Sequence, residues 1–248
     1  MEIKGKTAVI VGATGGIGRV LSMALALEGA NVVLVGRRRD VLSSLKNKIA
    51  EKKGMARIVS VDITKTRGVN TLYSILSRKY ACVDILIHAA GIGVYKSFEK
   101  VSFSDWKKSF DVNVNSVFII SQKLIPLLKK SNESYVISMG SGMGKVGVAK
   151  RSPYCSSKFA LRGLMLSLAK EYEETNIKFI LMTMGSILTS FGPLSLEEKI
   201  EKQKKGKKYI KPTELADFIV SKLLNNTLKT ENSFYPHNYF QESREGKT

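Results

Sequence analysis

The sequence has few of the residues that build a disulfide framework, a metal centre or a membrane span. Only two cysteines and two histidines occur in 248 residues, too few for a disulfide scaffold or a His/Cys metal cluster. No apolar run approaches the roughly 20 residues of a membrane-spanning helix. The N-terminus has no secretory pattern of positive charge followed by an apolar run. These absences predict a soluble, cytoplasmic protein with no metal and no membrane partner.

Acidic residues are also scarce. The chain has 21 Asp and Glu against 40 Lys and Arg, a formal net charge of +19. Basic residues are densest at 36–40 and 198–211, but neither run is interleaved with the several aromatic residues typical of a nucleic-acid surface. A nucleic-acid partner is therefore disfavoured. A solvated lysine-rich surface, or an acidic or phosphorylated small ligand, explains the charge better.

The order of secondary structure predicts an α/β protein. Short β-branched runs alternate with segments of helical periodicity, and several runs are continuously apolar, as in strands covered by helices on both faces. This order is typical of a doubly wound parallel sheet, the Rossmann fold, in one domain over residues 1–248. Residues 190–211 read as an inserted substrate loop or lid. The predicted strands are 7–12, 31–36, 56–62, 83–90, 134–140, 178–184 and 233–236, and one long helix is predicted over 105–130.

A glycine-rich turn follows the first predicted strand directly. In "VGATGGIG", Gly12, Gly16 and Gly18 have a G-x-x-x-G-x-G spacing, with Gly15 as an extra glycine. Such a turn lets the backbone approach a pyrophosphate, and the N-terminus of the following helix supplies N–H donors and a positive dipole. Glycine turns also serve packing alone. Its position, between the first strand and the first helix, favours dinucleotide binding.

The end of the second predicted strand bears on which dinucleotide binds. NAD sites commonly place an acidic residue there, whereas an arginine accommodates the 2′-phosphate of NADP. Residues 36–39 read "GRRR" and the first carboxylate is Asp40, which favours NADP(H) over NAD(H), with Arg37 as the best candidate. The alternative is that these arginines only begin a solvated helix. Asp62, after the third strand, either accepts from an adenine amino group or caps the next helix.

Tyr154 and Lys158 lie four residues apart in the helical segment "RSPYCSSKFALRGL". Residues at i and i+4 share a helix face, and a nearby ammonium stabilises a phenolate. The spacing therefore predicts that Lys158 lowers the pKa of Tyr154 and suits it to acid–base chemistry. The same spacing also occurs by chance in many helices.

Further residues turn this pair into a constellation. With Asn113 in "DVNVNSVF" and Ser141 after the strand "SYVISMG", the chain resembles the short-chain dehydrogenase/reductase family over about residues 5–190. "HAAG" at 88–91 resembles the family's N-N-A-G motif, and "MGSILT" at 184–189 its P-G-x-x-x-T segment. The sequence departs from the family pattern at Val11, at His88 and Ala89, and at Met184.

The resemblance implies a role for each of these residues. Tyr154 would exchange a proton with the substrate oxygen, Lys158 would lower its pKa and bind the nicotinamide ribose, and Ser141 would donate to the substrate oxygen. Asn113 would hold a water that links Lys158 to solvent, and Thr189 would bind the nicotinamide carboxamide. The cofactor-binding set so implied is Gly12, Thr14, Gly15, Gly16, Ile17, Gly18, Arg37, Arg38, Asp62, Ile63, Ala90, Gly91, Tyr154, Lys158, Gly185, Ile187 and Thr189.

The predicted activity is hydride transfer between NADP(H) and a small carbonyl or alcohol, including small ketones, aldehydes and 3-oxoacyl compounds. Residues 92–97, 142–151 and 190–211 are expected to wall the substrate site. The resemblance also implies a homodimer or homotetramer. The alternative function is a non-catalytic protein that senses NADP(H), since one fold hosts many functions.

Overall fold

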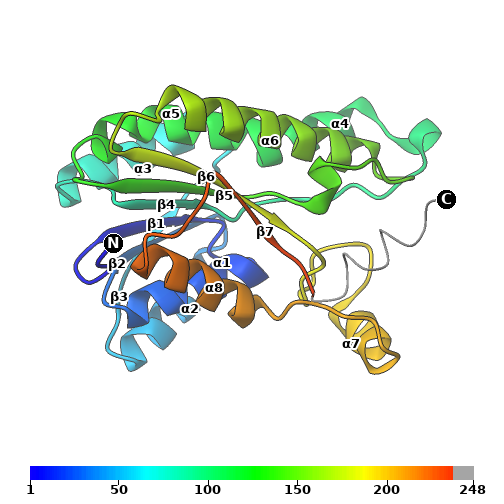
Figure 1. Cartoon of the computed structure of the whole chain (residues 1–248), viewed down its shortest axis with the longest axis horizontal. Coiled ribbons are helices and arrows are strands. Elements are labelled where there is room, and N and C mark those ends of the chain that lie inside the picture. Colours follow the sequence, from blue (N-terminus) through cyan, green and yellow to red (C-terminus); the bar gives the residue numbers. More distant parts are fainter. Residues whose placement is uncertain (237–248) are drawn as a thin grey trace.

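The computed structural model describes residues 1–236 of the chain. These residues form one seven-stranded parallel sheet between two layers of helices (Figure 1). The strand order is β3-β2-β1-β4-β5-β6-β7. The strands are β1 (Thr7–Val11), β2 (Asn31–Gly36), β3 (Met55–Ser60), β4 (Ile85–His88), β5 (Ser134–Met139), β6 (Ile177–Met184) and β7 (Glu231–Phe234). The helices are α1 (Gly16–Leu27), α2 (Arg39–Glu51), α3 (Thr66–Lys79), α4 (Phe103–Phe110), α5 (Ser116–Leu128), α6 (Ser152–Glu171), α7 (Leu196–Lys204) and α8 (Pro212–Leu224). The predicted fold class and single domain are confirmed. The bounds of β2 are as predicted, and those of the other strands differ from the prediction by at most two residues.

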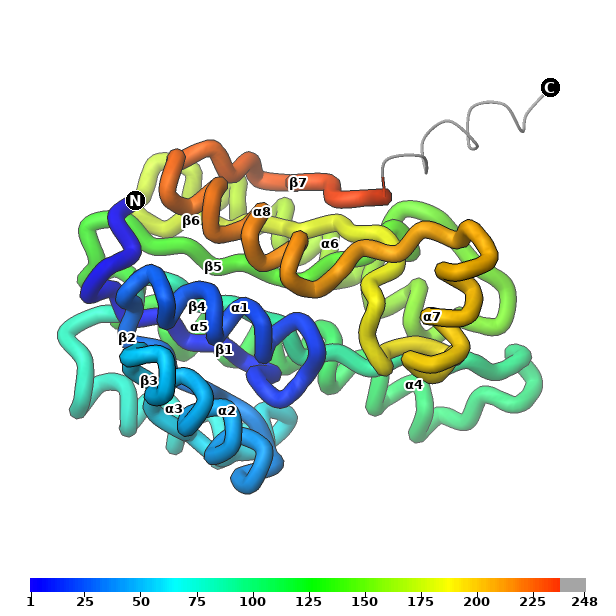
Figure 2. The backbone as a smooth tube through the Cα atoms, turned by 90° about the horizontal axis from the view of Figure 1, so that it is seen from below, coloured from blue at the N-terminus to red at the C-terminus, as the bar shows by residue number. Residues whose placement is uncertain are grey.

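Two apolar layers hold the helices to the sheet. Residues of α1, α2 and α8 pack in one hydrophobic cluster, and residues of α3, α5 and α6 pack in another on the opposite face (Figures 1 and 2). Because both faces are covered, the central strands are buried along their whole length, which explains their continuous apolar runs.

The strand order reverses beside β1. The chain runs outward from β1 to β2 and β3, then returns to place β4 on the other side of β1. In open α/β sheets, ligands bind outside the carboxyl ends of the strands at this reversal. The turns after β1 and β4 therefore occupy the position expected of a binding site.

The single helix predicted over residues 105–130 is found as one continuous helical run at 103–128, but the prediction missed an irregularity within it. The run consists of α4, a π-helical turn at Asp111–Asn115, and α5. The apolar pattern continues through the turn, so periodicity did not reveal it. Insertions of this kind concentrate at functional sites, and this one contains Asn113.

Residues 190–211 form a segment outside the sheet. It contains the nine-residue helix α7, which begins with a capping box between Ser195 and Glu198. A bridge between Ile187 and Ile210 closes the base of the segment. In Figures 1 and 2, α7 lies at the end of the molecule opposite the N-terminus.

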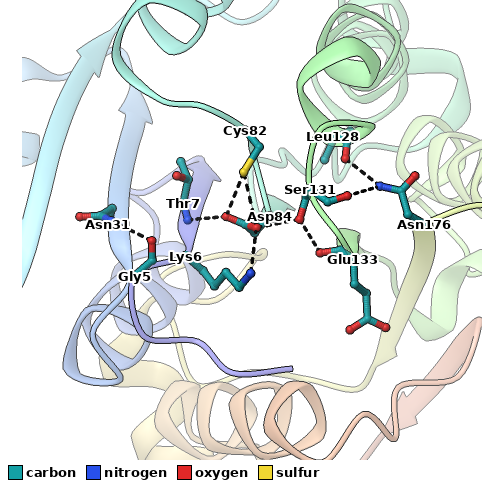
Figure 3. A network of polar contacts seen from close by, with 10 residues as sticks. All are labelled: Gly5, Lys6, Thr7, Asn31, Cys82, Asp84, Leu128, Ser131, Glu133 and Asn176. Atoms are coloured by element: carbon teal, nitrogen blue, oxygen red, sulfur yellow. Dashed lines mark hydrogen bonds and ion pairs between the residues drawn. The ribbon is translucent and has the colours of Figure 1, made fainter.

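A polar network joins the amino ends of the strands, at the edge opposite the strand-end turns. Asp84 is 3% exposed. Its carboxylate accepts hydrogen bonds from the Thr7 amide at 2.8 Å and the Ser131 hydroxyl at 2.7 Å, and pairs with Lys6 at 3.4 Å (Figure 3). It therefore links the start of β1 to the connection between α5 and β5.

We expect Asp84→Ala to destabilise the fold. The substitution leaves the buried Thr7 amide without an acceptor, at about 1–3 kcal/mol. It also removes one hydrogen bond of Ser131, which keeps the Glu133 carbonyl as an acceptor, at about 0.5–1.5 kcal/mol. For a chain of this size, a total of about 2–4 kcal/mol lowers the melting temperature by roughly 4–16 °C. Thermal denaturation of Asp84→Ala beside Asp217→Ala, whose side chain is exposed, tests this. Equal melting temperatures for the two variants would contradict it.

Candidate active site

The glycine turn after β1 is packed tightly against the end of β4. Gly12 has φ +88°, and a Cβ on it would lie 2.5 Å from the Ala90 nitrogen. Only glycine combines this left-handed conformation with so close a backbone approach. The turn therefore lies at the strand reversal, and the first N–H groups of α1, which lack intrahelical acceptors, begin there.

A distant segment closes the other side of the turn. A Cβ on Gly16 would lie 2.5 Å from Thr189 Cγ2, so the segment after β6 reaches the first residue of α1. A Cβ on Gly91 would lie 3.4 Å from the Asn113 side chain. The structure thus gathers the predicted cofactor residues from the turns after β1, β4 and β6. The glycine turn leaves no room for side chains at Gly12 and Gly16, and backbone N–H groups of α1 begin beside it. Both features fit a dinucleotide pyrophosphate.

The arginines after β2 lie beside the same turn. Arg38 donates from Nη2 to the Thr14 carbonyl at 3.2 Å, so this guanidinium, rather than that of Arg37, is tied to the glycine turn. The Arg37 charge and two hydrogen bonds from Thr64 act on the Asp62 carboxyl. The Thr64 amide has the largest effect, and together they lower the pKa of Asp62.

The helix-capping alternative for Asp62 is wrong. Helix α3 begins at Thr66 with Lys65 in the N-cap position. Asp62 instead accepts from the Thr64 amide at 3.0 Å and the Thr64 hydroxyl at 2.8 Å, a local turn that side chains of this length form readily. Its carboxylate is held at the end of β3, next to buried Ile63.

Tyr154 and Lys158 share one buried face near the start of α6, as their spacing predicts. Tyr154 is 6% exposed and Lys158 is 5% exposed. The Lys158 Nζ donates to the Met139 carbonyl at the end of β5, at 2.7 Å, and lies 5.8 Å from the centre of the Tyr154 ring. Both side chains are therefore anchored at the carboxyl edge of the sheet.

The expectation that Lys158 lowers the pKa of Tyr154 is not what the structure shows. Burial raises the pKa of the Tyr154 hydroxyl well above its ordinary value, and a hydrogen bond with Ser141 and the Arg151 charge offset only part of this. Burial also lowers the pKa of Lys158 to about 8. Removal from water disfavours the charged form of both groups. Tyr154 is consequently held as the neutral phenol, the form that donates a proton.

Asn113 makes its hydrogen bonds to the protein. Its Oδ1 accepts from the Ile92 amide and its Nδ2 donates to the Ile92 carbonyl, both at 2.9 Å. The same Nδ2 donates to Ser157 at 2.9 Å. The π-helical turn thus clamps the loop after β4 against α6, which holds Tyr154 and Lys158.

The three predicted wall segments meet at Tyr154. The ring of Tyr95 lies 6.3 Å from the Tyr154 ring, and that of Phe191 lies 5.8 Å from it, measured between centroids. Arg151 stacks over Tyr95 at 5.3 Å. These residues were not singled out from the sequence. Their only signal is that each falls in a segment expected to surround the substrate.

A buried lysine holds the segment that carries Thr189 and Phe191. Lys199 of α7 is 6% exposed, and its Nζ donates to the Thr189 carbonyl at 2.7 Å and to the Phe191 carbonyl. Burial lowers its pKa. The lysine-rich run at 198–211 predicted a solvated surface, and this member is an exception.

His88 stands where the family motif has asparagine. It is 3% exposed, its Nε2 lies 3.0 Å from the Ser121 hydroxyl, and burial lowers its pKa to about 3. The neighbouring Ala89 amide donates to the Val11 carbonyl at 2.8 Å. The imidazole is thus a neutral part of the interior between β4 and α5, and the backbone link between β4 and β1 is intact.

No helix within residues 1–236 is long and apolar enough to span a membrane. In the same part of the chain, no group of three or more His, Cys, Asp or Glu side chains is arranged to hold a metal ion.

The fold and the site together define a class. A doubly wound sheet carries a glycine turn at its strand reversal, with a tyrosine, a lysine and a serine beside it, as in oxidoreductases of the Rossmann type. A model of the short chain dehydrogenase family matches residues 6–199. The chain belongs to this family, and is an oxidoreductase that acts on hydroxyl and carbonyl groups.

Relatives cover most of the chain. It is 29% identical over 207 residues to the 3-oxoacyl-[acyl-carrier-protein] reductase of Aquifex aeolicus, covering 82% of this chain and 84% of that protein. It is 30% identical over 173 residues to the 3beta-hydroxysteroid dehydrogenase of Mediterraneibacter gnavus, covering 69% and 62%.

Solved structures share the fold. A putative NAD(P)-dependent gluconate 5-dehydrogenase from Beutenbergia cavernae with bound NADP superposes with a TM-score of 0.84 at 21% identity, over 97% of this chain and 100% of that chain. An actinorhodin polyketide ketoreductase variant with NADPH superposes with a TM-score of 0.83 at 22% identity, over 93% and 95%.

Proposed function

We propose that the protein is an NADP(H)-dependent carbonyl reductase or alcohol dehydrogenase in which Tyr154 is the general acid or base. The observation that carries this is the position of Tyr154. Its neutral hydroxyl shares a hydrogen bond with Ser141, and its ring lies beside Lys158. The residue lies at the carboxyl ends of the strands, as does the glycine turn. A general acid must hold a proton at neutral pH and reach the substrate oxygen. The raised pKa of Tyr154 supports the first requirement, and its position at the carboxyl ends of the strands, where ligands bind in such sheets, supports the second.

The chain's own residues then divide the work. As the carbonyl carbon is reduced, negative charge develops on its oxygen, and Tyr154 donates its proton to that oxygen. Ser141 donates a hydrogen bond to the same atom and stabilises the charge. Lys158 is held by the Met139 carbonyl beside the Tyr154 ring, where its ammonium would donate to the nicotinamide ribose. Asn113 keeps the π-helical turn in register with Ile92 and Ser157 and, through a water, would link Lys158 to solvent.

The cofactor supplies the hydride when bound. Gly12 to Gly18 and the start of α1 would hold its pyrophosphate, while Thr189, Ile187 and Gly185 would hold the nicotinamide end. Asp62, Ile63, Ala90 and Gly91 would contact the adenosine half and the ribose. Neighbours of the same fold are described with NADP or NADPH, and this supports a phosphorylated cofactor here.

Arg37 and Arg38 are proposed to select NADP(H) over NAD(H). A guanidinium forms bidentate hydrogen bonds with a phosphate. We expect the double variant Arg37→Ser/Arg38→Ser to weaken NADPH binding about 10- to 100-fold, from bonds to a charged group worth about 1.5–3 kcal/mol, while NADH binding changes less than about threefold. Fluorescence titration with both cofactors measures this. An equal loss for both would place the arginines outside the 2′-phosphate site.

Residues 190–211 are proposed as a lid over bound cofactor and substrate. Phe191 on this segment packs against Tyr154, and Lys199 ties Phe191 to α7. We expect NADPH to slow tryptic cleavage within the lysine-rich run at 198–211 at least about threefold by holding the segment closed. Peptide mapping of a timed digest, with NADP-free protein as the control, shows this. Cleavage at the same rate in both digests would count against the lid.

The substrate is proposed as a small carbonyl or alcohol, with 3-oxoacyl compounds among the candidates because the A. aeolicus relative is named as a 3-oxoacyl-[acyl-carrier-protein] reductase. A homodimer or homotetramer is also proposed. Phe118 of α5 and Phe159 of α6 are 47% and 46% exposed, and exposed aromatic side chains on neighbouring helices favour association.

Titration with NADPH and NADH, followed by a panel of carbonyl compounds monitored through cofactor absorbance, tests the proposed function. NADPH binding with turnover supports it. Tight NADPH binding without turnover on the whole panel would favour the alternative, a protein that senses NADP(H).

A further inference from the structure

A cation lies beside the proposed acid. Arg151 is the N-cap residue of α6, one turn before Tyr154. Its guanidinium carbon lies 5.3 Å from the centre of the Tyr95 ring, and this ring packs against Tyr154 at 6.3 Å. The side chain is partly buried. The Arg151 charge also offsets part of the rise in the pKa of Tyr154. Arg151 therefore lies near the reacting hydroxyl, with an aromatic ring beside it.

The charge of Arg151 has no carboxylate partner within residues 1–236. Within these residues its guanidinium donates one hydrogen bond, to the Met143 sulfur at 3.4 Å. Neighbouring cations differ in this respect: Lys145 pairs with Glu231 at 2.9 Å, and Lys96 pairs with Asp105 at 2.7 Å. A partly buried guanidinium paired only with a thioether and a ring has most of its donors free for another acceptor.

The segments on the Arg151 side of the site are basic or neutral. Residues 92–97 and 142–151 contain no Asp or Glu, whereas they contain Lys96, Lys145, Lys150 and Arg151. The third wall segment, 190–211, has its acidic residues on α7, at Glu197, Glu198 and Glu201. Since two of these cations are already paired, the remaining positive potential is centred on Arg151 and exposed Lys150. A charged wall of one sign concentrates ligands of the opposite sign.

We propose that Arg151 binds a carboxylate of the substrate, so that the protein prefers oxo acids and hydroxy acids to neutral carbonyl compounds. The planar guanidinium matches a carboxylate in a two-bond geometry, and binding it there brings the remainder of the molecule to Tyr154. The carboxylate is unchanged in the reaction, in which the keto carbon gains the hydride and its oxygen gains the proton. This inference names the substrate class of the proposed function and rests on it.

Matched pairs of compounds test it. Each pair is an oxo acid and its methyl ester, 3-oxobutanoate and 4-oxopentanoate being suitable, so the ketone is the same and only the charge differs. We expect Arg151→Gln to lower kcat/KM for the acids about 10- to 100-fold, mainly through KM, because a hydrogen bond to a charged group is lost. For the esters, kcat/KM changes less than about threefold. Arg151→Lys keeps the charge but not the two-bond geometry of the guanidinium, so its kcat/KM for the acids should lie between those of wild type and Arg151→Gln.

The controls separate binding of the carboxylate from packing. Arg57→Gln removes an exposed arginine from β3, the edge strand at the other end of the strand order from β7. We expect it to leave kcat/KM unchanged for both members of each pair. Melting temperatures of all variants verify folding. If Arg151→Gln lowers kcat/KM equally for the acids and the esters, the substitution acts only through the packing of Tyr95, and the proposal is overturned.

A binding measurement that needs no turnover distinguishes the proposed reductase function from the proposed carboxylate site at Arg151. If wild-type protein reduces neither member of any pair, the proposed reductase function fails, and saturation-transfer NMR with the same acids and esters decides the inference alone. Stronger binding of the acid than of the ester, lost in Arg151→Gln, supports an anion site at Arg151. Binding that is the same in both proteins, or no binding, overturns it.

Discussion

Tyr154→Phe is expected to remove NADPH-dependent carbonyl reduction while leaving NADPH binding within about threefold of wild type. The hydroxyl shares a hydrogen bond with Ser141, and general acid–base catalysis contributes about 10²- to 10⁴-fold. The phenyl ring keeps its contacts with Tyr95 and Phe191, so the packing around the cofactor is retained. Steady-state cofactor absorbance measures turnover, and fluorescence titration measures binding.

Tyr172→Phe is the matched control for this variant. Tyr172 follows the far end of α6, where its ring packs on Phe179, and its hydroxyl has no part in the proposed reaction. It should keep wild-type turnover. A Tyr154→Phe enzyme with more than about a tenth of wild-type kcat would place the proton donor elsewhere, since even the smallest expected contribution is about 100-fold.

Gly12→Ala is expected to disable cofactor binding. The left-handed conformation at φ +88° costs about 1–2 kcal/mol for a residue with a Cβ. The added carbon would also lie 2.5 Å from the Ala90 nitrogen and 2.9 Å from the Ala89 carbonyl carbon, both backbone atoms. The turn after β1 and the end of β4 must move apart, which displaces the N–H groups proposed to hold the pyrophosphate. We expect at least a tenfold loss of NADPH affinity, about 1.4 kcal/mol, and a lower melting temperature.

Gly5→Ala separates backbone strain from the close approach. Gly5 also has a left-handed φ, +76°, but nothing lies within 4 Å of the Cβ position. This variant should lose stability without losing NADPH affinity. Were Gly12→Ala to bind NADPH as Gly5→Ala does, the contact between the turn and the end of β4 would have no part in holding the cofactor.

The elements of the fold follow from local pattern, with one instructive failure. Continuous apolar runs of the length of strands, alternating with helical segments, predict the sheet because burial on both faces removes the usual alternation. The π-helical turn at 111–115 was missed. Its extra residue leaves the apolar content unchanged, and the turn is explained by a tertiary contact: Asn113 bonds to the backbone of Ile92 in the loop after β4.

Helical geometry alone places Tyr154 and Lys158 on one face, but it does not determine their protonation. The ammonium of Lys158 was expected to dominate the pKa of Tyr154. Burial dominates instead, because Tyr95 and Phe191 arrive from segments about 60 residues before and 40 residues after Tyr154 in the chain. The free energy of ionisation depends on how much water reaches the hydroxyl, and this depends on packing between distant segments.

By itself, the sequence determined the alternation of strands and helices, the glycine turn, the family resemblance and the shared helix face of Tyr154 and Lys158. These depend on backbone geometry and spacing within a few residues. Only the tertiary structure decided that Thr189 lies against Gly16, that Lys199 holds the turn at Phe191, and that Arg151 lies over the ring of Tyr95. Each is a contact between segments far apart in the chain, and such contacts exist only once the sheet has brought the ends of its strands to one edge.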